Sequence, residues 1–108
     1  MHLFPRKPKS TPGAFYFGDF EEVPLAPFSV SLATFDTTFL PEPKHYHEKN
    51  QKVYIVISGK AILDVDGEKV ELSPEVMVHV EPMEVHSIEK IVEGPFLFVV
   101  VASSKVSE

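Results

Sequence analysis

The sequence predicts an all-β fold, an antiparallel sandwich or barrel, and three observations carry this prediction. Short runs rich in β-branched and aromatic residues recur along the chain. Turn residues separate these runs, and the Asp66-Gly67 pair stands between two alternating segments, which is a strong hairpin signal. No window of a dozen residues repeats apolar side chains at helical spacing, and 10 prolines interrupt the chain.

The individual strands follow from the same pattern. We expect strands over residues 29–40, 53–58, 61–65, 68–72, 76–80, 86–92 and 95–102, with a hairpin closed at Asp66-Gly67. Residues 1–25 are the least regular part and form an arm or an added edge strand, whereas residues 26–104 form the barrel domain. A chain of 108 residues is one domain in the simplest interpretation, and it is long enough to bury a core without disulfides.

Two of the expected strands are apolar on both faces, over residues 53–57 and 96–101. A strand of a two-sheet domain usually exposes one face to water, and its side chains then alternate between apolar and polar. Something must therefore cover the second face of these strands, and so short a chain has little left to do it. The pattern predicts a homodimer.

Composition excludes several classes of protein. The net charge of −6 argues against nucleic acid as a partner, and the longest apolar run, residues 95–102, is too short to span a membrane as a helix. The N-terminus lacks the apolar core of a signal peptide, so we expect a cytoplasmic protein. Asn50 and Gln51 are the only side-chain amides in a chain rich in Glu and Lys, a bias that is typical of thermophilic proteins.

The stretch HYHEKNQKVYIVISG, residues 45–59, carries the clearest chemical signal. His45 and His47 are two residues apart, so both imidazoles lie on the same side of an extended chain. Neutral imidazole is the commonest protein ligand for transition metals, so these two side chains form half of a metal site. The chain has no cysteine, which excludes thiolate ligands.

At these residues the chain resembles the cupin superfamily. His45 and His47 match the HxH of the first cupin motif, Gly59 matches its closing glycine, and His86, in EVMVHVEPMEVHSI, matches the histidine of the second motif. The resemblance covers roughly residues 29–102, nearly the whole domain. It implies a double-sheet jelly-roll barrel in which His45, His47 and His86 converge on one divalent metal ion, with zinc, iron, nickel and manganese all open as its identity.

The position of the family's glutamate ligand holds a different residue in this chain. Counting back from Gly59 places Lys52 there, and counting forward from His47 places Gln51 there. Three interpretations stay open. The histidines bind a metal together with water or Gln51 while Lys52 points away, or a metal-free barrel uses Lys52 and the histidines to bind an anion, or the histidines only line the barrel. Tyr54 and Glu84 are further candidates for a ligand or a pocket residue.

The resemblance leads to two hypotheses about function. The first is a metal-dependent dioxygenase or isomerase acting on a small polar or anionic molecule. The alternative is a non-catalytic barrel that binds a sugar or carboxylate without a metal. The cupin fold hosts enzymes and binding proteins alike, so the sequence does not choose between them.

Overall fold

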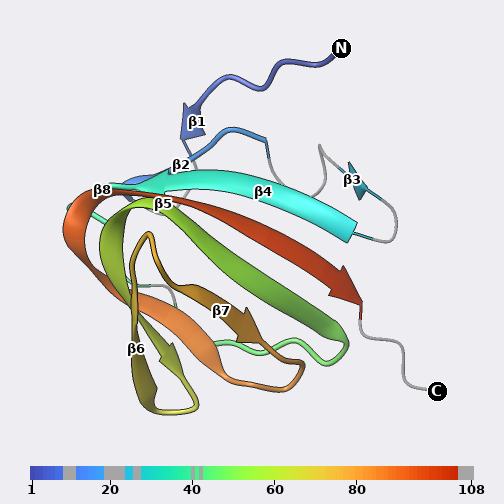
Figure 1. Cartoon of the computed structure of the whole chain (residues 1–108), viewed down its shortest axis with the longest axis vertical. Helices are drawn as coiled ribbons and strands as arrows, with labels where there is room; N and C mark the ends of the chain where they lie inside the picture. Colours follow the sequence, from blue (N-terminus) through green and yellow to red (C-terminus); the bar gives the residue numbers. More distant parts are fainter. Residues whose placement is uncertain (9–11, 19–23, 26–27, 40, 42, 105–108) are drawn as a thin grey trace.

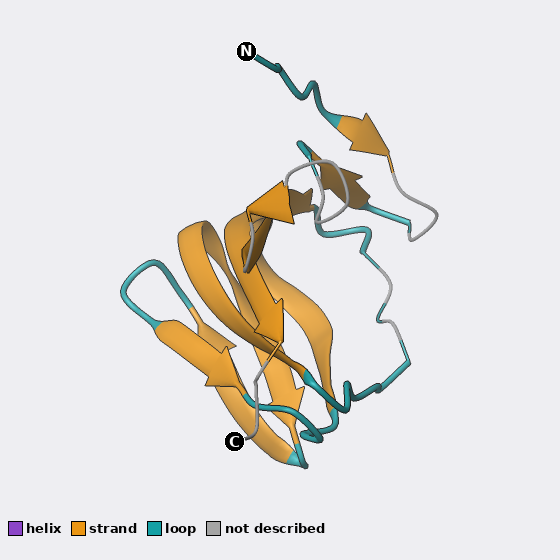
Figure 2. Cartoon of the chain, turned by 90° about the vertical axis from the view of Figure 1, so that its right-hand side faces the viewer, coloured by secondary structure: helices purple, strands orange, loops and turns teal. Residues whose placement is uncertain are grey.

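Antiparallel strands make up the regular structure, which confirms the all-β prediction (Figures 1 and 2). The computed structural model describes residues 1–8, 12–18, 24–25, 28–39, 41 and 43–104. Residue Leu40, at the end of the expected strand 29–40, and parts of the N-terminal arm lie outside these residues. Among the described residues, no helix is long and apolar enough to cross a membrane. The described residues form eight strands: β1 (Lys7–Pro8), β2 (Ala14–Tyr16), β3 (Pro24–Leu25), β4 (Phe28–Phe35), β5 (Asn50–Val65), β6 (Glu68–Leu72), β7 (Met77–Val80) and β8 (His86–Ser104).

Two long strands, β5 and β8, form the centre of the sheet, and the other strands flank them. The strand order is β1-β2-β4-β8-β5-β6, with β3 paired to β4 and β7 paired to β5. The first half of β5 pairs with β7 and with the end of β8, whereas its second half pairs with β6 and with the start of β8. Both strands curve strongly along their length (Figure 1), so they belong to both layers of the jelly roll.

The sequence predicts that strands end near Gly59 and near Glu93-Gly94, but the structure shows bends at these points instead. The β5–β8 ladder continues past Gly59 through irregular registers between Val56 and Ala61. Gly59 has φ +84°, and a Cβ there would lie 2.8 Å from Cα of Phe96, so only glycine fits this close approach. Bulges let the pairing continue while the strands bend. The residue pattern alone does not distinguish such a bend from the end of a strand.

The hairpin predicted at Asp66-Gly67 is confirmed. Asp66 has φ 50° and Gly67 has φ 87°, the positive pair that a two-residue turn between antiparallel strands requires. The turn joins β5 to β6 with Val65 opposite Glu68. Asp66 also accepts a hydrogen bond at Oδ1 from the Val85 amide, at 2.8 Å, so the turn holds the chain just before His86.

The core lies on the concave side of the sheet and is rich in aromatic rings. Phe35 stacks on Phe39 with centroids 4.4 Å apart, and it meets Phe98 edge to face at 5.0 Å. Phe39 reaches the core because β4 ends in a turn, in which Asp36 Oδ1 accepts a hydrogen bond from the Thr38 amide at 2.9 Å.

The opposite face of β5 is apolar and exposed within one chain. Ile55 is 39% exposed and Ile57 is 50% exposed, and Met77, which pairs with Ile55, is 68% exposed. Leu97, Val99 and Val101 lie on the same face of β8 and are half-buried. The expectation that both faces of these strands are buried therefore does not hold within a single chain. We call this surface, made by Val53, Ile55, Ile57, Met77, Leu97, Val99 and Val101, the outer face.

The buried carboxylate of Asp64 connects β5 to the β5–β6 turn and to β6. Asp64, on β5, is 1% exposed and accepts hydrogen bonds from the Gly67 amide at 3.0 Å and from Lys69 Nζ. Lys44 Nζ lies 3.4 Å from the same carboxylate, and Lys69 also pairs with Glu89. The Lys69 hydrogen bond, followed by the Gly67 amide, lowers the pKa of Asp64 to about 2.

The Asp64→Asn variant tests this network. The folded state holds the Asp64 carboxyl at a pKa of about 2, below the 3.8 of a free aspartate, so ionised Asp64 stabilises the fold above pH 3.8. That stability is lost as the pH falls from 3.8 toward 2. We expect Asp64→Asn to lower the melting temperature by several degrees at pH 7 and to flatten the acid limb of a melting-temperature profile. Glu71→Gln, at an exposed carboxylate of β6, is the matched control, and equal profiles for the two variants would contradict the assignment.

Candidate metal centre

Two segments that are distant in the sequence meet at one end of the sheet. The His45 amide donates to the carbonyl of His86 at 3.1 Å, and the His86 amide donates to the carbonyl of His45 at 2.8 Å. The Met83 amide donates to the carbonyl of His47 at 2.7 Å. Directly opposed residues of an antiparallel pair carry their side chains on the same side, so this pairing sets His45 beside His86.

The three histidines that the sequence singles out converge. The ring centroids of His45 and His86 are 4.5 Å apart, those of His45 and His47 are 5.3 Å apart, and those of His47 and His86 are 5.8 Å apart. One nitrogen from each ring lies within 4.8 Å of the corresponding nitrogen of the other two. Three imidazoles at such separations fit one divalent ion with open positions for other ligands.

Backbone carbonyls set the orientation of two of the rings. Nδ1 of His86 lies 2.9 Å from the carbonyl oxygen of Glu84, and Nδ1 of His45 lies 3.1 Å from that of Pro43. A carbonyl only accepts hydrogen bonds, so Nδ1 carries the proton in both rings and Nε2 keeps its lone pair. Metal-binding histidines are commonly held in this way.

Two of the ring nitrogens are buried and lack a hydrogen-bond partner within the described residues. They are Nε2 of His47 and Nε2 of His86. Burial lowers the pKa of His47, and the charge of Lys52 lowers it further. Burial is also the main cause that lowers the pKa of His86, against a hydrogen bond to Glu84 that raises it. Both rings are therefore neutral at neutral pH, in the state that binds a metal.

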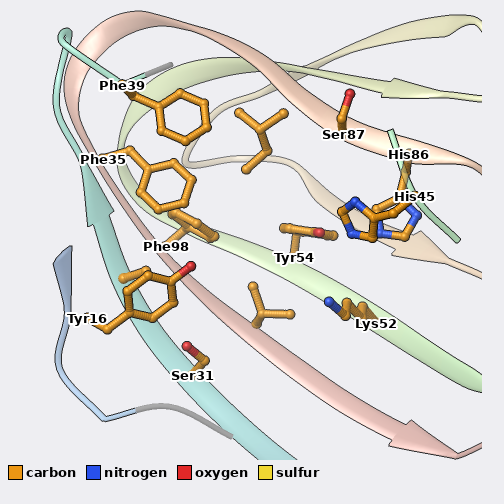
Figure 3. Close-up of a pocket in the computed structure, with 13 residues that line it drawn as sticks. Tyr16, Ser31, Phe35, Phe39, His45, Lys52, Tyr54, His86, Ser87 and Phe98 are labelled. Carbon is orange, nitrogen blue, oxygen red and sulfur yellow. The ribbon is translucent and has the colours of Figure 1, made fainter. Parts of the chain in front are cut away.

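A cavity of about 90 Å³ opens beside the histidines on the concave side of the sheet (Figure 3). His45 and His86 line one end of it, and the side chain of Lys52 points into it near the histidines and Tyr54. The expectation that Lys52 points away from the site is therefore wrong, whereas metal binding by the three histidines stays a prediction. Lys52 pairs with Val80 and Ala102, which are both buried, so the pleat directs its side chain inward.

The other candidate residues have different places. Tyr54 lines the cavity two residues after Lys52. Gln51 lies on the opposite side of β5, where its amide contacts His79 Nε2 at 2.8 Å and Ser103 Oγ at 3.3 Å. It therefore lies apart from the cluster of three histidines. The carboxylate of Glu84 accepts the Glu81 amide at 2.6 Å within its own loop, and Glu84 serves the site through its backbone carbonyl.

Sequence reasoning missed part of the cavity. Ser31, Phe35, Phe39 and Phe98 line it together with Tyr16 (Figure 3). Alternation along residues 29–35 places Ser31 and Phe35 on the same face, so the pattern holds the signal that they face the core. It holds no signal that this part of the core is hollow.

Comparison with known proteins agrees with this geometry. Residues 34–102 match the family model described as "Cupin domain". No curated protein sequence is similar to the chain. Many solved structures share its fold at low sequence identity, which supports the fold, and three of them are compared below.

The structure of KdgF from Halomonas sp. superposes with a TM-score of 0.78 at 17% identity, over 97% of this chain and 96% of that one. A cupin protein from Bacteroides fragilis gives a TM-score of 0.71 at 21% identity, over 100% of this chain and 90% of that one. A sugar phosphate isomerase of the cupin superfamily from Silicibacter pomeroyi gives 0.69 at 16% identity, over 95% and 71% of the two chains. With its matching family model, its jelly-roll strands and its paired histidine segments, this chain belongs to the cupin superfamily.

Proposed function

We propose that this chain binds a divalent metal ion through His45, His47 and His86 and holds a small anionic molecule beside it. The observation that carries the proposal is the convergence of three imidazoles beside a cavity that also contains Lys52. The buried, unpartnered Nε2 atoms of His47 and His86 support it, because a bound ion would satisfy both. When bound, the ion acts as a Lewis acid toward an oxygen of the ligand.

Lys52 is the residue that distinguishes this site from a complete cupin motif. A glutamate at this position would cancel part of the ion's charge, whereas the Lys52 ammonium adds to it. Two cations near one cavity attract an anion and repel each other, so a bound anionic group stabilises both. We therefore expect the anion to contact Lys52 Nζ and the metal together, with the ring and hydroxyl of Tyr54 beside it.

Dioxygenation and isomerisation are the two reaction classes that we consider for this site, and the Silicibacter pomeroyi neighbour is a sugar phosphate isomerase. The two classes differ in their need for a redox-active ion and for oxygen. Oxygen uptake by the iron-loaded protein, absent in the zinc-loaded protein, identifies the first class. Turnover with either ion and without oxygen uptake identifies the second.

A metal-free barrel that binds an anion is the second candidate, and the inward Lys52 favours it. The Lys52 ammonium repels a cation held by the histidines and so lowers the affinity of the site for that cation. In that case Lys52 and the histidines contact the anion directly, and the ligand would bind equally well in the presence of a chelator.

Calorimetry with zinc, iron, nickel and manganese separates the two candidates. We expect the wild type to bind at least one of these ions, His47→Ala to weaken binding by about a hundredfold or more, and Lys52→Glu to strengthen it by restoring a carboxylate. Glu84→Gln is the matched control, because its carboxylate is held in its own loop while its backbone contact to His86 is kept. Absence of binding in both the wild type and Lys52→Glu would exclude the metal site.

Metal affinity should also depend on pH. Protonated imidazole cannot bind an ion, so binding competes with protons once the histidines begin to titrate. The lowered pKa values of His47 and His86 keep these rings neutral to a more acidic pH than a free histidine. We expect affinity, measured by calorimetry in matched buffers, to fall only at a pH below the ordinary histidine value of about 6.5, with more than one proton displaced per ion at the acid end. A profile that stays flat until the protein unfolds in acid would contradict binding through these rings.

We further propose that the protein is a homodimer joined through the outer face. Residues Val53, Ile55 and Ile57 of β5 lie beside Leu97, Val99 and Val101 of β8, without a charged side chain among them. A contiguous apolar surface of this kind is uncommon on a monomer. The described part of the N-terminal arm does not cover it, because β1 and β2 extend the sheet beyond β4.

Sedimentation tests the dimer. The wild type should sediment as a dimer at micromolar concentration, and Ile55→Lys should sediment as a folded monomer, because Ile55 is already 39% exposed in the single chain. Val92→Lys, at a position 48% exposed elsewhere on β8, should leave the dimer intact. A monomeric wild type, or loss of the dimer in both variants, would refute the assignment of this face.

A further inference from the structure

The cavity has a second polar point on the side away from the histidines. Ser31, on β4, is 2% exposed and lines the cavity, and its hydroxyl oxygen has no hydrogen-bond partner within the described residues. Figure 3 shows Ser31 and the histidines at opposite sides of the cavity, with Tyr54 between them. A buried hydroxyl without a partner is unfavourable, so this position calls for a hydrogen-bonding group from a bound molecule or for a water.

The wall between the two polar points is aromatic. Phe35 meets Phe98 edge to face at 5.0 Å, and Tyr54 lies 6.2 Å from Phe98 with the two rings nearly parallel. Ala33 and Val100 complete the same wall. A hydroxyl group placed against these rings would lose its hydrogen bonds to water, whereas a flat apolar body would gain contact area. The wall therefore favours a flat ring.

Strand register gives the distance between Ser31 and the aromatic wall at Tyr54. Ser31 lies opposite Val100, and Val100 lies opposite Tyr54, so Ser31 is two strands away from β5 on the same face of the sheet. Neighbouring strands are about 4.8 Å apart, which puts the Ser31 and Tyr54 backbones roughly 10 Å apart. The histidines and Lys52 lie beyond Tyr54, so a ring placed beside Tyr54 with one polar group on each side reaches both polar points.

We propose that the ligand of this pocket is a small aromatic carboxylate with a second hydrogen-bonding substituent, and that Ser31 recognises this substituent. The carboxylate lies at the histidines and Lys52, the ring lies against Phe98 and Tyr54, and the substituent reaches the Ser31 hydroxyl. This assignment rests on the proposed function, because the carboxylate end uses the metal and Lys52. It adds to the proposed function one residue that determines specificity, Ser31 on β4, and the chemical class of the ligand.

Calorimetry on the zinc-loaded protein tests the assignment with gluconate, benzoate, 3-hydroxybenzoate and 4-hydroxybenzoate. We expect one of the hydroxybenzoates to bind at least about tenfold more tightly than gluconate and about fivefold more tightly than benzoate. In Ser31→Ala the advantage over benzoate should disappear while benzoate binding stays within about twofold of the wild type. Ser58→Ala, at an exposed serine of β5, should keep the wild-type pattern.

The outcomes separate this inference from the proposed function. If the protein binds zinc and gluconate binds as well as the hydroxybenzoates, the aromatic ligand is excluded while the metal and anion site stands. If Ser31→Ala keeps the full hydroxyl advantage, Ser31 does not recognise the ligand and a water is its partner. If neither zinc nor any of the four anions binds, the proposed function itself fails. Ligand-free Ser31→Ala should melt no lower than the wild type, because the change removes an unpartnered hydroxyl, and a lower melting temperature would assign Ser31 a structural role instead.

Discussion

The long antiparallel pairing of β5 with β8 is the interaction on which the other features depend. It runs from Asn50 opposite Ser104 to Val65 opposite His86. One end of this ladder sets the inward row of Lys52 and Tyr54, and the other end fixes where β8 begins, which is at His86. The histidine cluster, the cavity and the outer face are therefore consequences of one register. A shift by one residue would turn Lys52 outward and expose the aromatic core.

Much of this arrangement follows from the residue pattern. The hairpin at Asp66-Gly67 is predictable because only a few residue pairs adopt two successive positive φ values. The convergence of His45, His47 and His86 follows from the resemblance of two motifs to those of a known family. The inward direction of Lys52 also follows from alternation, once the strand is known to begin at Asn50 rather than at Val53.

Other features depend on contacts between distant residues and do not show in the pattern. Bends and strand ends look alike in sequence, because glycine serves both, and the close approach of Gly59 to Phe96 decides between them. The location of the cavity depends on how far Phe35, Phe39 and Phe98 fill the space between the layers. Gln51 shows the same limit: its neighbours in sequence suggest a ligand, yet its partners His79 and Ser103 come from other strands.

The mutual hydrogen bonds between His45 and His86 have a consequence for the chain as a polymer. They close a loop that contains all of β5, β6 and β7 and the turns between them. Two backbone hydrogen bonds are a weak closure, and this chain has no cysteine with which to make a covalent one. An ion shared by the two imidazoles would act as a removable cross-link that restricts the unfolded chain much as a disulfide does, without requiring an oxidising compartment.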